Sequence, residues 1–142
     1  MSGAAQSVAM TRSDRQVAGD TAEGLVAARL ADAGWTVLAR QVRVGRRELD
    51  IVAVDPGPPA RLVAVEVRWR AGRAFGLPEE TFDRRKRGHV VAAALGLVEA
   101  GRLPDGRALP RLPLGFDLVV VEPGAGRGDG PRVRHHRDAL AR

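Results

Sequence analysis

The sequence contains no cysteine, which excludes disulfide bonds and metal sites built on thiolates. No apolar run approaches the ~20 residues that a membrane-spanning helix needs. The N-terminal residues also lack the long apolar core of a signal peptide. We therefore expect a soluble, cytoplasmic protein with no membrane partner. With 142 residues, 44% of them hydrophobic, the chain is long enough for one domain and too apolar to be wholly disordered.

Lysine is almost absent, and Lys86 is the single lysine among 23 basic residues. The codon usage of a GC-rich genome explains arginine in place of lysine, but it does not explain the net charge of +6. An excess of basic over acidic residues favours a polyanionic partner, most simply nucleic acid.

The pattern of apolar residues predicts an α/β fold in which helices pack on a central mixed β-sheet. Helices are expected over residues 13–34 and 79–100. Strands are expected over residues 35–39, 48–54, 61–69 and 114–122, with an edge strand over 132–136. Residues 40–47 contain four arginines and one glycine, and we expect them to form a basic turn.

We expect one core domain with less ordered segments on both sides of it. The expected segments are a disordered tail over residues 1–13, the core domain over 14–122, a linker over 123–131 and a C-terminal strand or arm over 132–142. The linker is expected to be flexible because its nine residues include four glycines and two prolines.

Charged residues are concentrated in two of the predicted strands. Glu48 and Asp50 are two residues apart on one strand, and Glu66 and Arg68 are two apart on the next. Alternate residues of a strand share a face, so strand pairing would gather three carboxylates and a guanidinium at one end of the sheet. Their repulsion favours a bound cation, and oxygen ligands suit Mg²⁺ or Mn²⁺. The alternative is that these charges only protect a strand edge from aggregation.

Two segments, Arg47-Glu48-Leu49-Asp50 and Val65-Glu66-Val67-Arg68, resemble the signature of the PD-(D/E)XK nuclease superfamily. Further motifs follow along the chain in the same order as in one family of this superfamily. They are Ala22-Glu23, Phe75-Gly76, Lys86 and Phe116-Asp117-Leu118-Val119. The ordered set is similar to the YraN-like family of uncharacterised bacterial proteins, which are related to archaeal Holliday-junction resolvases. The resemblance covers about residues 19–140 and implies a restriction-endonuclease-like fold, a central mixed β-sheet flanked by helices.

The resemblance also implies a function and roles for particular residues. The reaction would be Mg²⁺- or Mn²⁺-dependent phosphodiester hydrolysis of structured or branched DNA. Asp50, Glu66 and the Val67 carbonyl would bind the metal ion, and Glu23 would reach a metal ion, often through water. Glu48 would lie near the site. Resolvase-like relatives are often dimers, so a homodimer is one expectation, although the sequence identifies no interface.

Arg68 occupies the position of the catalytic lysine, which is the main departure from the superfamily pattern. An arginine binds phosphate well but is a poor general base, because its pKa stays above ~12. Three interpretations stay open. Arg68 serves electrostatically in an active nuclease, another basic group such as Lys86 replaces the lysine, or the protein binds nucleic acid without cutting it. A protein-interaction domain on the same fold is a further alternative. Arg47 also departs from the family pattern, which usually has glycine just before the Glu-x-Asp motif.

The remaining candidates are residues that would contact nucleic acid. Arginines that flank the carboxylates are expected to bind backbone phosphates without sequence preference, namely Arg40, Arg43, Arg46, Arg47, Arg70 and Arg73. Trp69, at a strand end beside the site, is expected to stack on bases, whereas Trp35 is expected in the core. For Lys86, the alternative to a role in the site is a lysine whose stem covers apolar surface. His89 is expected on the surface.

Overall fold

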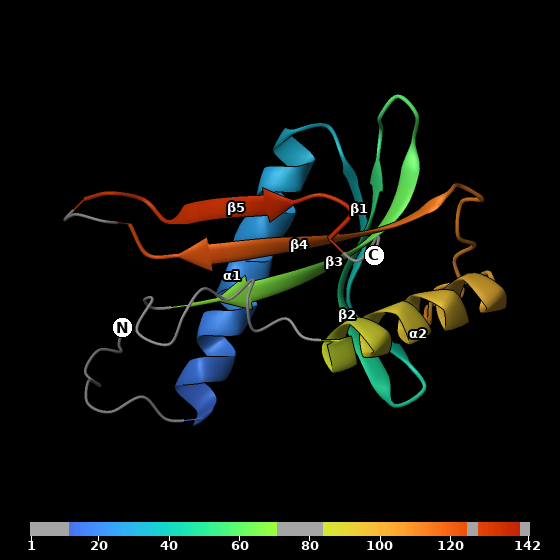
Figure 1. Ribbon diagram of the computed structural model, residues 1–142, viewed down its shortest axis with the longest axis horizontal. Coiled ribbons are helices and arrows are strands. Elements are labelled where there is room, and N and C mark those ends of the chain that lie inside the picture. The colour runs from blue at the N-terminus through green and yellow to red at the C-terminus, as the bar shows by residue number, and fades with distance from the viewer. Residues whose placement is uncertain (1–11, 71–83, 125–127, 140–142) are drawn as a thin grey trace.

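The computed structural model describes residues 12–70, 84–124 and 128–139 (Figure 1). Its elements are α1 (Arg12–Asp32), β1 (Thr36–Val44), β2 (Arg47–Asp55), β3 (Arg61–Trp69), α2 (Arg84–Ala100), β4 (Leu114–Glu122) and β5 (Arg132–His136). None of the helices in these ranges is long and apolar enough to cross a membrane. Residues 1–11 of the tail expected over 1–13, the start of the second helix over 79–83 and part of the linker, 125–127, lie outside the described residues. The last two residues of the expected tail, 12–13, belong to α1 instead.

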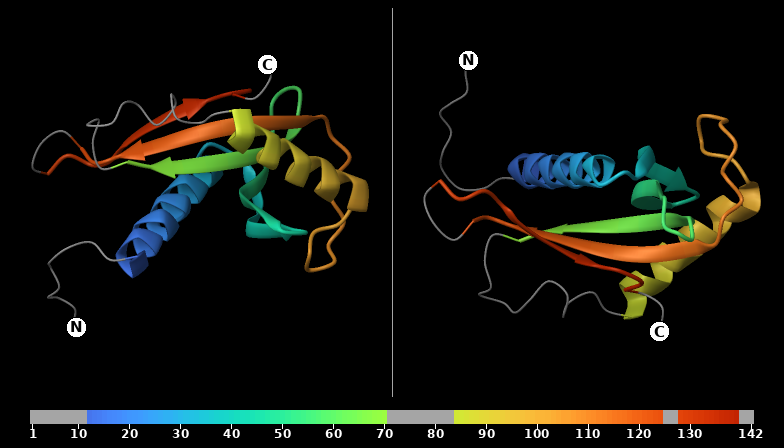
Figure 2. Two further views of the ribbon diagram at one scale, coloured as in Figure 1. Left: turned by 60° about the horizontal axis from the view of Figure 1, so that its bottom comes forward. Right: turned by 90° about the horizontal axis from the view of Figure 1, so that it is seen from above.

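The described strands form one five-stranded sheet in the order β1-β2-β3-β4-β5. β3 and β4 are parallel, because α2 carries the chain from one to the other, and the other neighbours are antiparallel. α1 covers one face of the sheet and α2 the other, as the view from above shows (Figure 2). This architecture confirms the predicted α/β fold with a mixed sheet flanked by helices.

The central strand, β3, is apolar on both faces because each face is covered by a helix. Val63 and Val65 pack in the cluster beneath α1. Leu62 and Ala64 pack in the cluster beneath α2. α1 contributes Ala22, Val26 and Leu30 to its cluster, at the four-residue spacing of one helix face. The parity of each strand therefore decides on which side of the sheet a charged side chain lies.

The predicted basic turn over residues 40–47 is wrong. β1 continues to Val44 and β2 begins at Arg47, which leaves only Gly45 and Arg46 as the turn. The arginines did not prevent a strand, because Val42 is buried while the next residue, Arg43, is exposed, as on a strand with one face in water. Arg40, two residues before Val42, is also exposed, and the positive φ of 51° at Gln41 interrupts the alternation between them.

The other predicted boundaries hold to within a few residues. α1 ends two residues before Gly34, where the backbone turns left-handed (φ 94°). The Trp35 N–H bonds the Leu30 carbonyl and the Gly34 N–H bonds the Ala31 carbonyl, which satisfies the last turn. The predicted edge strand over residues 132–136 is confirmed as β5, paired with β4.

Candidate functional site

The two carboxyl groups predicted to form the site, Asp50 and Glu66, lie where β2 separates from β3. The backbone pairing of these strands runs from Asp55–Arg61 to Ile51–Val65 and stops there. On the other side of Asp50, the pairing with β1 skips Gln41, whose backbone has a positive φ of 51°. Asp50 therefore occupies a local irregularity of the sheet.

Asp50 replaces the missing backbone pairing with a side-chain contact. Its Oδ2 accepts a hydrogen bond of 2.8 Å from the Val67 N–H. This contact fixes the Asp50 carboxylate against β3, next to Glu66. The Val67 backbone, which the resemblance assigned to the site, is thus in direct contact with Asp50.

Asp50 and Glu66 are joined by a hydrogen bond between their side chains. Burial, the charge of Asp50 and this hydrogen bond raise the pKa of Glu66 to about 8. Burial also raises the pKa of Asp50, and the Val67 N–H and Glu66 counter part of that effect. Two carboxyl groups in contact do not readily ionise together, so the pair favours a state with one shared proton at neutral pH.

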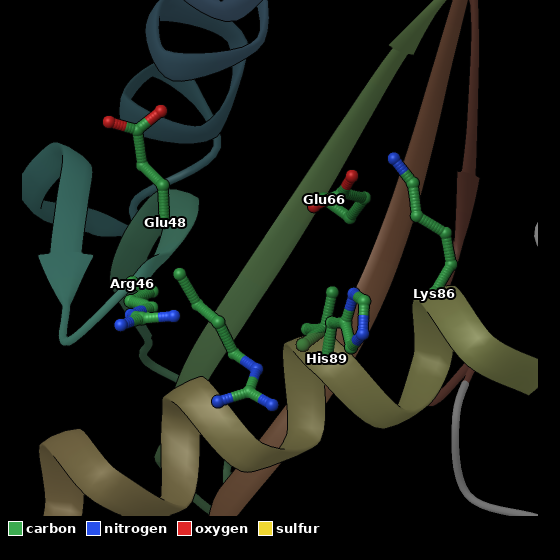
Figure 3. A pocket seen from close by; sticks show the side chains of 7 residues that line it. Arg46, Glu48, Glu66, Lys86 and His89 are labelled. Carbon is green, nitrogen blue, oxygen red and sulfur yellow. The ribbon is translucent and has the colours of Figure 1, made fainter.

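A cavity of about 390 Å³ opens beside Glu66 and combines charges of both signs. Its charged and imidazole lining residues are Arg46, Arg47, Glu48, Glu66, Lys86 and His89. In Figure 3, Glu48 of β2 and Lys86 of α2 flank Glu66 of β3 on opposite sides. The cavity thus has carboxyl groups on its sheet side and basic groups around them.

Lys86 and Arg68 are the cations that act on the carboxyl pair. The charge of Lys86 lowers the pKa of both Asp50 and Glu66, and the charge of Arg68 lowers that of Glu66. Neither outweighs the effect of burial on Glu66. Lys86 is exposed and lines the cavity, and Arg68 is half-buried on the same face of β3 as Glu66. His89, expected on the surface, is exposed there and also lines the cavity.

Glu23 does not join the carboxyl pair. It is buried on α1, across the sheet from α2, and its Oε1 lies 3.8 Å from Nη2 of Arg40. Glu48 is exposed at the cavity. Within the described ranges, no three His, Cys, Asp or Glu side chains are grouped closely enough to hold a metal ion. The structure brings together two of the expected carboxylates, Asp50 and Glu66.

The residues expected to contact nucleic acid are distributed around the cavity and beyond it. Arg46 and Arg47 line the cavity, and Arg43 is exposed on β1. Arg70 is half-buried directly after β3, and Trp69 is 38% exposed at the end of that strand. Arg73 lies outside the described residues. Trp35, expected in the core, is buried beneath α1.

A second group of charges escaped the sequence analysis. On the face covered by α1, Asp117 of β4 accepts a hydrogen bond from the Asp138 N–H at 3.0 Å and lies 2.8 Å from His135 Nε2. Arg61 Nη2 lies 3.0 Å from Asp55 Oδ2 and 3.4 Å from Asp117 Oδ2. The available signal was that Asp117 is the one acid inside an apolar strand, but its partners are far away in sequence.

Comparison with known proteins gives a consistent result. The model of the uncharacterised protein family UPF0102 matches residues 22–121. A UPF0102 protein of Symbiobacterium thermophilum is 36% identical over 107 residues, covering 75% of this chain and 82% of the relative. A UPF0102 protein of Anaeromyxobacter dehalogenans is 40% identical over 128 residues, covering 85% of this chain and 81% of the relative. A third, of Roseiflexus castenholzii, is 38% identical over 106 residues, covering 75% and 79%.

These matches span both strands of the carboxyl pair, α2 with Lys86, and β4 with Asp117. They confirm the YraN-like resemblance drawn from the ordered motifs. The chain belongs to the uncharacterised protein family UPF0102.

Proposed function

We propose that this protein binds nucleic acid in the cytoplasm and hydrolyses phosphodiester bonds of structured DNA with the help of a bound divalent metal ion. The observation that carries the proposal is the Asp50–Glu66 pair, which shares a proton at the edge of a basic cavity. A structural ion cluster has no need of two carboxyl groups that prevent each other from ionising. The superfamily resemblance supports the same chemistry.

The chemistry of the pair suits Mg²⁺ or Mn²⁺. Asp50, Glu66 and the Val67 carbonyl offer only oxygen ligands, which these ions prefer. Because the pKa of Glu66 is raised, the nearby cations do not compensate the pair fully, and a divalent ion would do so. When bound, the ion would supply an activated water and offset charge on the phosphate.

The surrounding side chains would bind and orient the substrate. Arg68, on the same face as Glu66, is suited to hold a phosphate oxygen through two parallel hydrogen bonds. Lys86 would stabilise negative charge that develops on the phosphate. Arg46 and Arg47, on the cavity wall, would contact neighbouring phosphates of the backbone. None of these contacts reads a base, so the chain's own cations give affinity rather than sequence preference.

Arg68 itself favours a second candidate, a nucleic-acid-binding module that does not cut. An arginine cannot accept a proton from water at neutral pH, because its pKa stays above ~12. Lys86 would contact phosphate in either case. A protein-interaction domain on this fold is the third hypothesis, and it predicts no salt-dependent binding to nucleic acid.

The test is a cleavage assay with Mg²⁺ and with Mn²⁺ on single-stranded, duplex, flap and four-way-junction DNA. Wild type is compared with Glu66→Ala, Arg68→Lys and a control, Glu99→Ala, which removes an exposed carboxylate of α2. We expect wild type and Glu99→Ala to cut and Glu66→Ala to be inactive. Cutting by Arg68→Lys alone would mean that the arginine disables an otherwise intact site. If no variant cuts but wild type still binds DNA, the protein is a binding module.

A further inference from the structure

A second cavity, of about 320 Å³, lies between α1 and the connection from β4 to β5. Trp69 forms part of its wall, together with apolar side chains from three other segments, namely Ala22 and Leu25 of α1, Val121 of β4 and Pro123. Asp129 is the acidic residue of the lining. The cavity is therefore mainly apolar, with one aromatic ring and one acidic hydrogen-bond acceptor in its lining.

Trp69 differs from the other tryptophan in its exposure. Trp35 is 8% exposed and packs in the core beneath α1, whereas Trp69 is 38% exposed. Among the described residues, the other large apolar side chains with high exposure, Leu95 and Val98, lie on α2. An indole ring that is left in contact with solvent inside a cavity is available to stack on a ligand.

The position of Trp69 links this cavity to the carboxyl pair. Trp69 is the last residue of β3, three residues after Glu66, which corresponds to about 10 Å along a strand. Glu66 and Arg68 lie on the face of α2, and Trp69, by alternation, lies on the face of α1. A nucleic-acid strand that passes the end of β3 would therefore meet the two sites in succession. Arg68 and Arg70 flank Trp69 in sequence and add positive charge for its phosphates.

We propose that this cavity binds one unpaired nucleobase, stacked on Trp69, of a nucleic acid whose backbone reaches the Asp50–Glu66 pair. This inference rests on the proposed function. A base has a flat apolar face for the indole and polar edges for an acceptor such as Asp129. The volume is near the lower limit, about 300 Å³, of ligand pockets and suits a small planar group.

The base site makes a prediction about the preferred substrate. Bases within a duplex are stacked on their neighbours and do not enter a protein cavity without being extruded. Unpaired nucleotides at an overhang, flap or junction need no such extrusion. The protein should therefore bind DNA with unpaired nucleotides more tightly than a uniform duplex, and Trp69 should account for the difference.

The experiment compares two duplexes in EDTA, so that no strand is cut. One duplex carries a short overhang of thymidines, and the other carries an overhang of the same length made of abasic residues. Both present the same phosphates, and only the first presents bases. The proteins are wild type, Trp69→Ala, Trp69→Phe and Leu95→Ala, the last being a control that removes an exposed apolar side chain of α2.

We expect wild type and Leu95→Ala to prefer the thymidine overhang by about 5- to 150-fold, the range that one stacked base produces. Trp69→Ala should bind the two duplexes equally, and Trp69→Phe should keep part of the preference. The thymidine overhang should also quench the tryptophan fluorescence of wild type and not that of Trp69→Phe.

Equal binding of the two overhangs by wild type would overturn the base site, and salt-dependent binding of both duplexes would still support the proposed function. An unchanged preference in Trp69→Ala would also overturn the base site. If wild type binds neither duplex at any salt concentration, the proposed function fails and the base site fails with it.

Discussion

Two groups of acids lie on opposite faces of one sheet, and their pKa values are shifted in opposite directions. Asp50 and Glu66, on the side of α2, have raised pKa values because burial and mutual repulsion outweigh Lys86 and Arg68. Asp55 and Asp117, on the side of α1, have lowered pKa values although burial acts on them too. The difference lies in the partners that each group has.

The partners of Asp55 and Asp117 are numerous and close. The Gly57 N–H, Arg61 and Arg137 together overcome the burial of Asp55. His135, the Asp138 N–H and Arg61 overcome that of Asp117. These contacts join the start of β3 to the segment that follows β5, so this group stabilises the fold. The Asp50–Glu66 pair lacks such compensation, which is typical of a site that binds a cation or takes part in a reaction.

The largest expected effect is from removing the shared cation of the compensated group. Arg61→Met leaves Asp117 without its guanidinium and Asp55 with Arg137 alone, and should lower the free energy of unfolding by about 3 to 5 kcal/mol. The same substitution at Arg68 should cost much less, because the Asp50–Glu66 pair can hold a proton in place of a cation. Urea unfolding at neutral pH measures the free energy of unfolding of both variants. Equal losses for the two variants would contradict the distinction between the two groups.

The next effect concerns the pH dependence of stability. The pKa of Glu66 is about 8 in the folded protein, against an ordinary value of 4.5 for a glutamate in water, so folding favours its protonated form. This contribution to stability is complete below about pH 4.5 and is lost as the pH rises towards 8. The pKa shifts of Asp55 and Asp117 have the opposite sign. Their contribution to stability is lost as the pH falls below 3.8, the ordinary pKa of an aspartate.

Urea midpoints measured between about pH 3 and pH 9 test this prediction. Glu66→Gln should reduce the decline in stability above about pH 4.5, leaving only the part due to Asp50, and should leave the decline at acid pH unchanged. Asp117→Asn should alter the decline in stability at acid pH. It should leave the decline at higher pH unchanged. If the proposed metal site exists, saturating Mg²⁺ should weaken the decline at higher pH in wild type only, because the ion would bind the ionised pair in the folded state. A decline above pH 4.5 that keeps its full size in Glu66→Gln would refute the assignment to this residue.

The smallest effect is on salt-dependent binding to nucleic acid. Arg46→Ala and Arg47→Ala should each reduce the slope of log affinity against log salt by about 1, since each removes one phosphate contact. Arg111→Ala is the control, because Arg111 is exposed at a third cavity, next to the C-terminal end of α2 and away from the carboxyl pair. Filter binding to a duplex at several salt concentrations gives the slopes. A reduction of the same size for Arg111→Ala would mean that the charge acts without a defined interface.

The sequence by itself determined the order of the elements, the central place of β3 and the facing positions of Asp50 and Glu66. These follow from local rules, since strand alternation and turn residues act over a few positions. The length of β1 was not within reach of the same rule, because the alternation is interrupted at Gln41 and the density of arginine favoured a turn.

Only the tertiary structure decided which charges meet. Asp117 is 56 residues from Arg61, and 18 from His135, and no local pattern connects them. Glu23 is paired with Arg40 across the α1 face, whereas Lys86 and His89 reach the cavity from α2. The protonation of Glu66 depends on burial together with a neighbouring carboxylate. Both conditions arise only when β2 and β3 come together and then separate at Asp50.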